Sequence, residues 1–375
     1  MSSFTNRWNG KILSLMAVGL IIGCSQGPRE SDEAERKVVP TAIPEPTATP
    51  PPVRLSLPSW VSDEISEGAL SRVRDALPDR EVVLVERDAT EWDIGLDLFN
   101  PSSVNTTTKP WIIERLGLYV NRVLLAQTGT QTVGETWEEI AEAASRLKEQ
   151  KGMERALALP GDLAGLPGTL VTLMTLTNLT TAAGEHPLVS PNARRALDFL
   201  QSLHAKGLYK IGPGTGLSRS EAVDLVAQGK SAMTLAWSLS ADRIMQPTGS
   251  SISEQIQVFP PPAFRGGSVP SPEQLVRPWW WSVRTEDVPS NVSEQLLENL
   301  SEWRPADFVG GEWFTPKEPP VTPGVHRVLS TMTWTTQENK AVYRVLADGW
   351  SQGQSSDVIL RGLQVRLAAL RSGVK

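Results

Sequence analysis

The sequence predicts an α/β protein with a mixed, mostly parallel sheet flanked by helices. Residues 53–99 read as strand 53–58, helix 66–77, and strands 81–85 and 93–99. This order favours a βαβ unit. The chain has 375 residues, which is enough for two or more compact units with a sizeable core.

The stretch 116–152 carries the clearest local signals: an apolar strand, a loop and then a helix. Thr136 and Glu139 have the spacing of a capping box. Apolar residues then recur every three to four positions, starting at Trp137, so one face of the helix is expected to be buried. Gly152 suits the left-handed conformation that ends such a helix.

Further elements follow from apolar periodicity and from helix-capping residues. Ser190-Pro191 and the pair Ser218 and Glu221 mark two helix starts. Residues 100–110 are polar and turn-rich, so we expect a loop there. The remaining expected elements are strands at 156–159, 231–237 and 278–284, and helices at 169–181, 190–207, 218–229, 290–303, 325–350 and 356–370.

The N-terminal region has the layout of an export signal followed by a tether. Residues 1–11 carry two positive charges, and the apolar run 12–23 is shorter than the roughly 20 residues that span a bilayer. Cys24, the single cysteine, closes this run. Residues 25–52 hold seven prolines and few bulky apolar residues, so a disordered tether reaching roughly 80 Å is expected. The alternative is an uncleaved N-terminal anchor with a chance cysteine.

Composition and motif content exclude several functions. A net charge of −6 without a basic run argues against a nucleic-acid partner. His186, His204 and His326 have no second ligand at metal-binding spacing, so neither a metal nor another cofactor is expected. No nucleophile or phosphate-loop motif is present, and nothing brings acids such as Asp307 and Glu312 together as a glycosidase needs. We therefore expect a binding protein and not an enzyme.

Several segments resemble the bacterial extracellular solute-binding proteins of ABC importers, the maltose-binding-protein-like family. A strand ending in Tyr119-Val120-Asn121 precedes a helix that opens Thr136-Trp137-Glu138-Glu139. Farther on, the segment EAVDLVAQGKSAM is followed by Trp237, and VFPPP at 258–262 matches the strand that recrosses the hinge in this family. The last helix, with the sequence VILRGLQVRLAAL, also matches the end of the family's chains.

This resemblance implies a two-lobed, periplasmic-binding-protein-like fold of type II. Lobe 1 would comprise about residues 53–115 and 262–315, and lobe 2 about residues 116–260 and 320–375. Only about twenty residues separate the Asp93 strand from Tyr119, whereas the family has several dozen there, so the first lobe is expected to be abridged. A small solute, a carbohydrate or another polyol, would bind between the lobes and be delivered to an ABC permease. The alternative is a sensor or interaction module that does not transport.

Residues 20–24, Leu-Ile-Ile-Gly-Cys, resemble the bacterial lipobox, in which the cysteine is lipidated and becomes the new N-terminus. This resemblance implies a signal peptide at 1–23, a tether at 24–52 and a solute-binding unit at 53–375. The protein would be a monomer held at the cell membrane by acyl groups on Cys24, facing the periplasm or the cell exterior.

Tryptophan is abundant: the chain has thirteen tryptophans and three tyrosines, and an indole suits stacking on the apolar face of a sugar ring. Trp137, Trp303 and Trp350 sit on helix stripes or ends, and we expect them in the core. At least one of the three tryptophans at 279–281 should face away from the core, since neighbours on a strand alternate. The candidate ligand contacts, chosen by the resemblance and by this alternation, are Trp92, Asp93, Trp237, Trp280, Trp313 and Trp334.

Overall fold

A computed structural model gives the fold of a unit that begins at Pro50. The expected signal peptide at 1–23, most of the expected tether and Cys24 lie outside the described residues. So do Trp313 and Trp334. The described residues are 50–57, 63–85, 92–98, 106–129, 132–177, 188, 190–212, 214–245, 250, 252–267, 276–284, 288–303 and 336–372.

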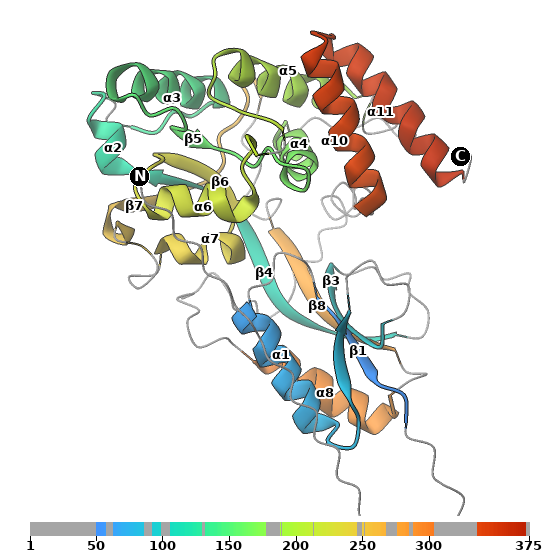
Figure 1. The fold of residues 1–375 in the computed structure, drawn as a ribbon. Helices are drawn as coiled ribbons and strands as arrows, with labels where there is room; N and C mark the ends of the chain where they lie inside the picture. The colour runs from blue at the N-terminus through green and yellow to red at the C-terminus, as the bar shows by residue number, and fades with distance from the viewer. Residues whose placement is uncertain are drawn as a thin grey trace, which may run out of the picture. The chain divides into compact units, whose positions relative to one another are not determined.

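The described strands are hydrogen-bonded in the order β2-β1-β3-β8-β4-β6-β5, with β7 paired to β4 (Figure 1). This path comprises two mixed sheets that share β4. Pairs β1–β2, β1–β3 and β5–β6 are parallel, and the pairs that β4 and β8 make are antiparallel. The mixed α/β class is confirmed, although antiparallel pairs outnumber parallel ones in the part described. The strands are β1 Val53–Ser56, β2 Val82–Val85, β3 Ile94–Leu98, β4 Thr106–Asn121, β5 Leu157–Ala158, β6 Met233–Trp237, β7 Ile256–Phe259 and β8 Val276–Arg284.

Strand β4 belongs to two sheets. From Thr106 to Arg115, which lies opposite Val276, its partner is β8. From Leu116 onward, its partners are β6 and β7. The change of partner falls at Leu116, where lobe 2 was expected to begin, and the division into lobes stays a prediction. At this point the Arg115 amide donates to Ser238 Oγ at 3.1 Å.

The expected loop at 100–110 is wrong for residues 106–110, which form the start of β4. Three consecutive threonines favour an extended strand, and β8 supplies the hydrogen-bonding partner. Proline has no amide hydrogen to donate. Among the described strands this half of β4 has β8 on one side only, so Pro110 lies on an edge strand, where a missing amide donor is tolerated.

The helices follow the predicted pattern with three additions: α2, α7 and a 3₁₀ turn at Ser253–Gln255. Helix α4 begins earlier than expected, since a proline is tolerated in the first turn of a helix. The start of the expected helix 325–350 lies outside the described residues. The helices are α1 Asp63–Ala76, α2 Arg122–Ala126, α3 Trp137–Lys151, α4 Gly165–Leu176, α5 Pro191–Ala205, α6 Arg219–Ala227, α7 Ser238–Met245, α8 Ser290–Glu302, α10 Thr336–Ser351 and α11 Ser356–Arg371.

The predicted start and end of α3 are confirmed. Thr136 accepts a hydrogen bond from the Glu139 amide, and the Glu139 carboxylate accepts from the Thr136 amide, which is the complete capping box. Gly152 ends the helix at φ 64°, in the left-handed region. Trp137 is fully buried, as expected for the first residue of the apolar stripe.

One core of the unit is built around tryptophan. It joins β1, β3 and β8 to helices α1 and α8, which lie beside each other (Figure 1). The register of β4 shifts between Pro110 and Ile112, and the residue at this bulge, Trp111, is buried. Its ring stacks on Trp303 at 5.7 Å between centroids, and its Nε1 donates to the Trp303 carbonyl at 2.8 Å. Four of the tryptophans that the structure describes belong to this core: Trp111, Trp279, Trp281 and Trp303.

A second core surrounds the other half of β4. Strands β5 and β6 and helices α3, α4, α5, α10 and α11 contribute to it. Trp350 stacks on His204 at 5.8 Å between centroids, so the expectation that Trp350 is a core residue is confirmed. The helices described in this chain include none with the length and apolarity that crossing a bilayer requires.

Candidate functional site

Trp92 and Asp93 make their contacts within the first sheet, the one that contains β1, β3 and β8. Asp93 is 2% exposed. Its carboxylate accepts from the Arg54 amide at 2.6 Å and from Arg54 Nη2 at 3.1 Å. The Arg284 guanidinium lies 4.5 Å from the ring centroid of Trp92. These contacts hold β1, β3 and β8 together where β3 begins.

Strand register places this pair far from the change of partner in β4. The Arg284 amide donates to the Asp93 carbonyl at 2.9 Å, and Arg284 lies opposite Thr106, the first residue of β4. From Thr106 to Leu116 the strand rises roughly 30 Å at about 3.3 Å per residue. A ligand bound near Leu116 would therefore not reach Trp92 or Asp93 unless it were very long.

Trp280 faces away from its two neighbours, as alternation predicts. Trp279 and Trp281 are buried in the tryptophan-rich core, whereas Trp280 is only partly buried and lies opposite Pro110 of β4. Six residues of β4 separate Pro110 from Leu116, which is roughly 20 Å. The structure thus does not bring the four described candidates together, and their role in ligand binding stays a prediction.

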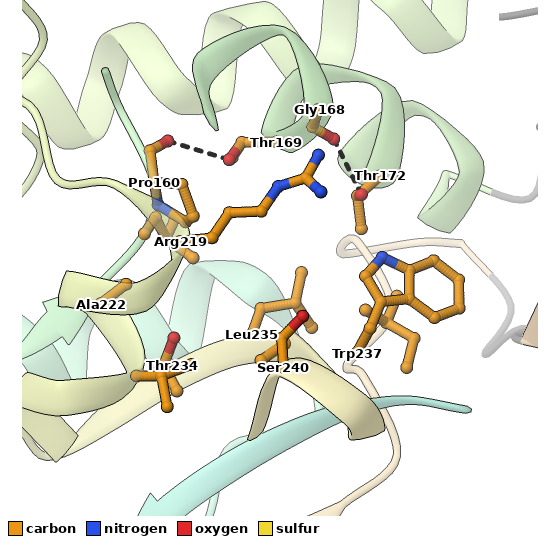
Figure 2. A pocket seen from close by; sticks show the side chains of 14 residues that line it. Pro160, Gly168, Thr169, Thr172, Arg219, Ala222, Thr234, Leu235, Trp237 and Ser240 are labelled. Carbon is orange, nitrogen blue, oxygen red and sulfur yellow. Dashed lines mark hydrogen bonds between the residues drawn. The ribbon is translucent and has the colours of Figure 1, made fainter. Parts of the chain in front are cut away.

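Trp237, the last residue of β6, lines a pocket beside Leu116 (Figure 2). The pocket contains about 500 Å³ of space not filled by atoms, part of it open to solvent. Helices α4 and α6 and the start of α7 complete its wall. The lining residues are Leu116, Leu159, Pro160, Gly168, Thr169, Thr172, Arg219, Ala222, Val223, Thr234, Leu235, Ala236, Trp237 and Ser240.

Three threonines line this pocket, and the hydroxyl of each donates its proton to a backbone carbonyl. Thr169 donates to the Pro160 carbonyl at 2.9 Å and Thr172 to the Gly168 carbonyl at 2.8 Å, as the dashed lines in Figure 2 show. Thr234 donates to the Ala158 carbonyl at 2.8 Å. A hydroxyl that donates its proton still has lone pairs. Thr169 and Thr172 can therefore accept hydrogen bonds from a ligand, whereas Thr234 is fully buried.

Arg219 supplies donors to the same pocket. It is the first residue of α6, and the Ser218–Glu221 capping box fixes where that helix starts. Its side chain reaches α4 beside Gly168 (Figure 2). A Cβ atom at Gly168 would lie 2.5 Å from Arg219 Nη2, so the close approach of the guanidinium depends on glycine at this position.

The floor of the pocket is held by a buried phenol. The Tyr209 hydroxyl donates to the Pro160 carbonyl at 2.8 Å, which also accepts from Thr169. Burial raises the pKa of Tyr209 well above its usual range, and the nearby charge of Asp162 adds to this shift. The phenol is therefore neutral and keeps its donor at physiological pH.

Sequence reasoning found Trp237 but missed Arg219 and the threonines. Thr169 and Thr172 are three apart, which places them on one face of a helix, and this spacing was an available signal. Nothing local indicates that Arg219 reaches across to α4. Among the described residues, no three His, Cys, Asp or Glu side chains gather as metal ligands would.

Comparison with known proteins identifies the family. Residues 74–298, more than half of the chain, match the model of the bacterial extracellular solute-binding protein family. The chain belongs to this family. The resemblance noted in the sequence is thereby confirmed. A search of curated proteins gave no match to this solute-binding protein.

Solved structures share its fold at low sequence identity. The maltose-bound MalE3 of T. maritima has a TM-score of 0.59 at 15% identity, and the match covers 85% of this chain and 99% of that one. A ribitol-bound protein of Agrobacterium radiobacter K84 has a TM-score of 0.60 at 13% identity, covering 84% and 98%. A laminaribiose-bound protein of Arthrobacter chlorophenolicus A6 has a TM-score of 0.58 at 14% identity, covering 85% and 99%. These likenesses confirm the periplasmic-binding-protein type of fold.

Proposed function

We propose that this solute-binding protein is a lipoprotein that captures a sugar or polyol outside the cytoplasm and delivers it to an ABC importer. The observation that carries the proposal is the pocket beside Trp237. It combines an indole, two threonine hydroxyls able to accept and a guanidinium able to donate. The similar structures named above hold maltose, ribitol and laminaribiose.

The chemistry of a polyol fits these groups. Each sugar hydroxyl both donates and accepts, so it needs partners of both kinds within a small space. Thr169 and Thr172 supply acceptors and Arg219 supplies donors. Trp237 is partly exposed in the pocket, and an indole face can cover the apolar side of a sugar ring.

The capture step would use two lobes. Lobe 1 comprises about residues 53–115 and 262–315, and lobe 2 about residues 116–260 and 320–375. The change of partner in β4 at Leu116 supports a hinge there, and β7, paired to the same strand, supports a second crossing near Val258. Ligand would bind between the lobes, and hinge closure would then present the closed form to the permease. No chemical step is involved.

A thermal-shift screen with neutral sugars, polyols, amino acids and peptides tests the proposal. We expect sugars or polyols to raise Tm, because a ligand at a hundred times its Kd stabilises by about 2.7 kcal/mol. Trp237→Ala should reduce this shift, and Val365→Ala, at an exposed position of α11, is the control. A folded protein that responds to none of these solutes, or to amino acids alone, would overturn the proposal.

The lipid anchor has its own test. Cys24→Ser should release the protein from the membrane fraction, since a thioether to lipid requires the thiol. The unaltered protein provides the control in the same fractionation. Continued membrane association of Cys24→Ser would contradict the lipoprotein assignment and leave the solute-binding assignment standing.

A further inference from the structure

We propose that the natural ligand is a sugar that carries a methyl group, as a 6-deoxyhexose does, and that this methyl group is buried against an apolar inner wall of the pocket. This inference rests on the proposed function, because it names the chemical class of the solute that the same pocket takes. It goes beyond that function, which treats all sugars and polyols alike.

The residues that line the pocket include a buried inner wall and a partly exposed rim. The rim contains Thr172 of α4, Arg219 of α6, Trp237 of β6 and Ser240 of α7. The inner wall is mostly aliphatic, and each of its apolar members is at most 9% exposed: Leu116, Leu159, Ala222, Val223, Leu235 and Ala236. A ligand therefore meets polar groups at the rim and aliphatic carbon inside the pocket.

Two hydroxyls reach the inner wall, and each already donates its proton to the backbone. Thr169 donates to the Pro160 carbonyl at 2.9 Å, and Thr234 donates to the Ala158 carbonyl at 2.8 Å. The Pro160 carbonyl also accepts from the Tyr209 hydroxyl at 2.8 Å, so both of its lone pairs are used. Among the described side chains of the inner wall, none is left to donate a hydrogen bond to a ligand oxygen.

A methyl group suits this wall better than a hydroxyl does. A ligand hydroxyl placed there loses its water and gains at most one acceptor, the Thr169 oxygen, so its own oxygen stays without a donor. Burial of a polar group that is not fully hydrogen-bonded is unfavourable. A methyl group needs no partner, and its transfer from water to an apolar surface is favourable. The ring hydroxyls of the same sugar would stay at the rim, beside Thr172 and Ser240.

Trp237 and Leu235 together form a continuous apolar surface. Leu235 lies two residues before Trp237 on β6, so both side chains point to the same face of the strand. Both line the pocket (Figure 2). A sugar ring that stacks its apolar side on the indole would therefore direct a methyl substituent at its edge onto the aliphatic wall.

Calorimetric titration of matched sugar pairs tests the inference. The pairs are L-fucose with L-galactose and L-rhamnose with L-mannose, and the members of each differ by one oxygen atom at carbon 6. We expect the 6-deoxy member to bind about ten- to a hundred-fold more tightly, the discrimination that an apolar pocket achieves for one small group. N-acetyl-D-glucosamine with D-glucose is a further pair, in which the methyl group belongs to an acetamido group.

Two substitutions then locate the effect. Ala236→Ser adds a hydroxyl donor to the inner wall with little change in volume, so it should reduce the preference for the 6-deoxy sugar several-fold. Ala368→Ser makes the same change at an exposed position of α11 and should leave the preference unchanged. Leu235→Asn, which places an amide beside Trp237, should reduce the preference further, and its Tm without ligand reports whether it is folded. If it does not fold, Ala236→Ser alone decides the test.

The outcomes separate this inference from the proposed function. Equal binding of both members of each pair, or an unchanged preference in folded Ala236→Ser, overturns the assignment of a methyl group to this wall and leaves sugar capture intact. A preference for N-acetyl-D-glucosamine without one for the 6-deoxy sugars keeps the methyl-binding wall and makes the acetamido group its source. Failure of every sugar and polyol to bind a folded protein overturns the proposed function together with this inference.

Discussion

Replacing Trp111 with phenylalanine should destabilise the protein without weakening ligand binding. The substitution removes the indole Nε1, which donates to the Trp303 carbonyl at 2.8 Å. Loss of a buried hydrogen bond with one partner left in place costs about 1–3 kcal/mol. The smaller ring also leaves a cavity of about 40 Å³, which at about 24 cal/mol per Å³ adds roughly 1 kcal/mol. The expected loss in the free energy of unfolding is therefore about 2–4 kcal/mol.

Urea unfolding monitored by circular dichroism measures this loss as a lower midpoint with an unchanged slope. Val365→Ala is the control, because Val365 is 71% exposed and exposed substitutions change stability by less than about 0.5 kcal/mol. Sugar affinity is measured on both variants. An unaltered midpoint for Trp111→Phe, or a lower affinity at normal stability, would refute the assignment of this tryptophan to the core.

Three further substitutions extend these expectations. Thr136→Ala should reduce the free energy of unfolding by about 1 kcal/mol, as loss of a helix cap does, whereas Thr136→Ser should behave like the parent in the same urea titration. Asp93→Asn should cost about 1–3 kcal/mol, because the buried carboxylate that Arg54 bonds would be neutralised and the arginine is partly solvated; a change in sugar affinity at normal stability would instead support Asp93 as a ligand contact. Above about pH 10 the free energy of unfolding should fall with a slope of up to about 1.4 kcal/mol per pH unit for each such phenol, since Tyr209 ionises in the unfolded chain while burial keeps its folded-state pKa high. Tyr209→Phe should make that fall shallower, and an unchanged slope would show that Tyr209 does not contribute.

Sequence reasoning succeeded where side chains act within their own segment. The capping box of α3 joins Thr136 to a residue three positions away, so its effect can be read without knowing the rest of the fold. The end of α3 at Gly152 can likewise be predicted from its own segment. Alternation along β8 likewise predicted that the three consecutive tryptophans at 279–281 face in different directions.

The path of β4 was not predictable in this way. Its partners are chosen by contacts with strands more than a hundred residues later, and Pro110 by itself indicates a break. For the same reason, the sequence could not show which tryptophans belong to the core. Trp111, in the bulge of β4, reaches Trp303 at the end of α8, which composition alone cannot distinguish from a sugar contact.

The candidate site shows the same division between local and distant information. Trp237 was found because it ends a recognisable strand. Arg219 was missed because its position depends on the space that Gly168 leaves on another helix. Register then separated Trp92 and Asp93 from the pocket, a relation that only strand pairing reveals.

The double membership of β4 also determines when the protein can fold. Its first half can pair only after β8 has been synthesised, and its second half only after β6 and β7. Synthesis must therefore pass residue 284 before both sheets can be completed. Pairing between such distant segments is slow, because loop closure precedes any stabilising contact. An emerging chain would therefore remain largely unfolded for most of its synthesis. That state is the one in which a polypeptide can be threaded across a membrane before it folds.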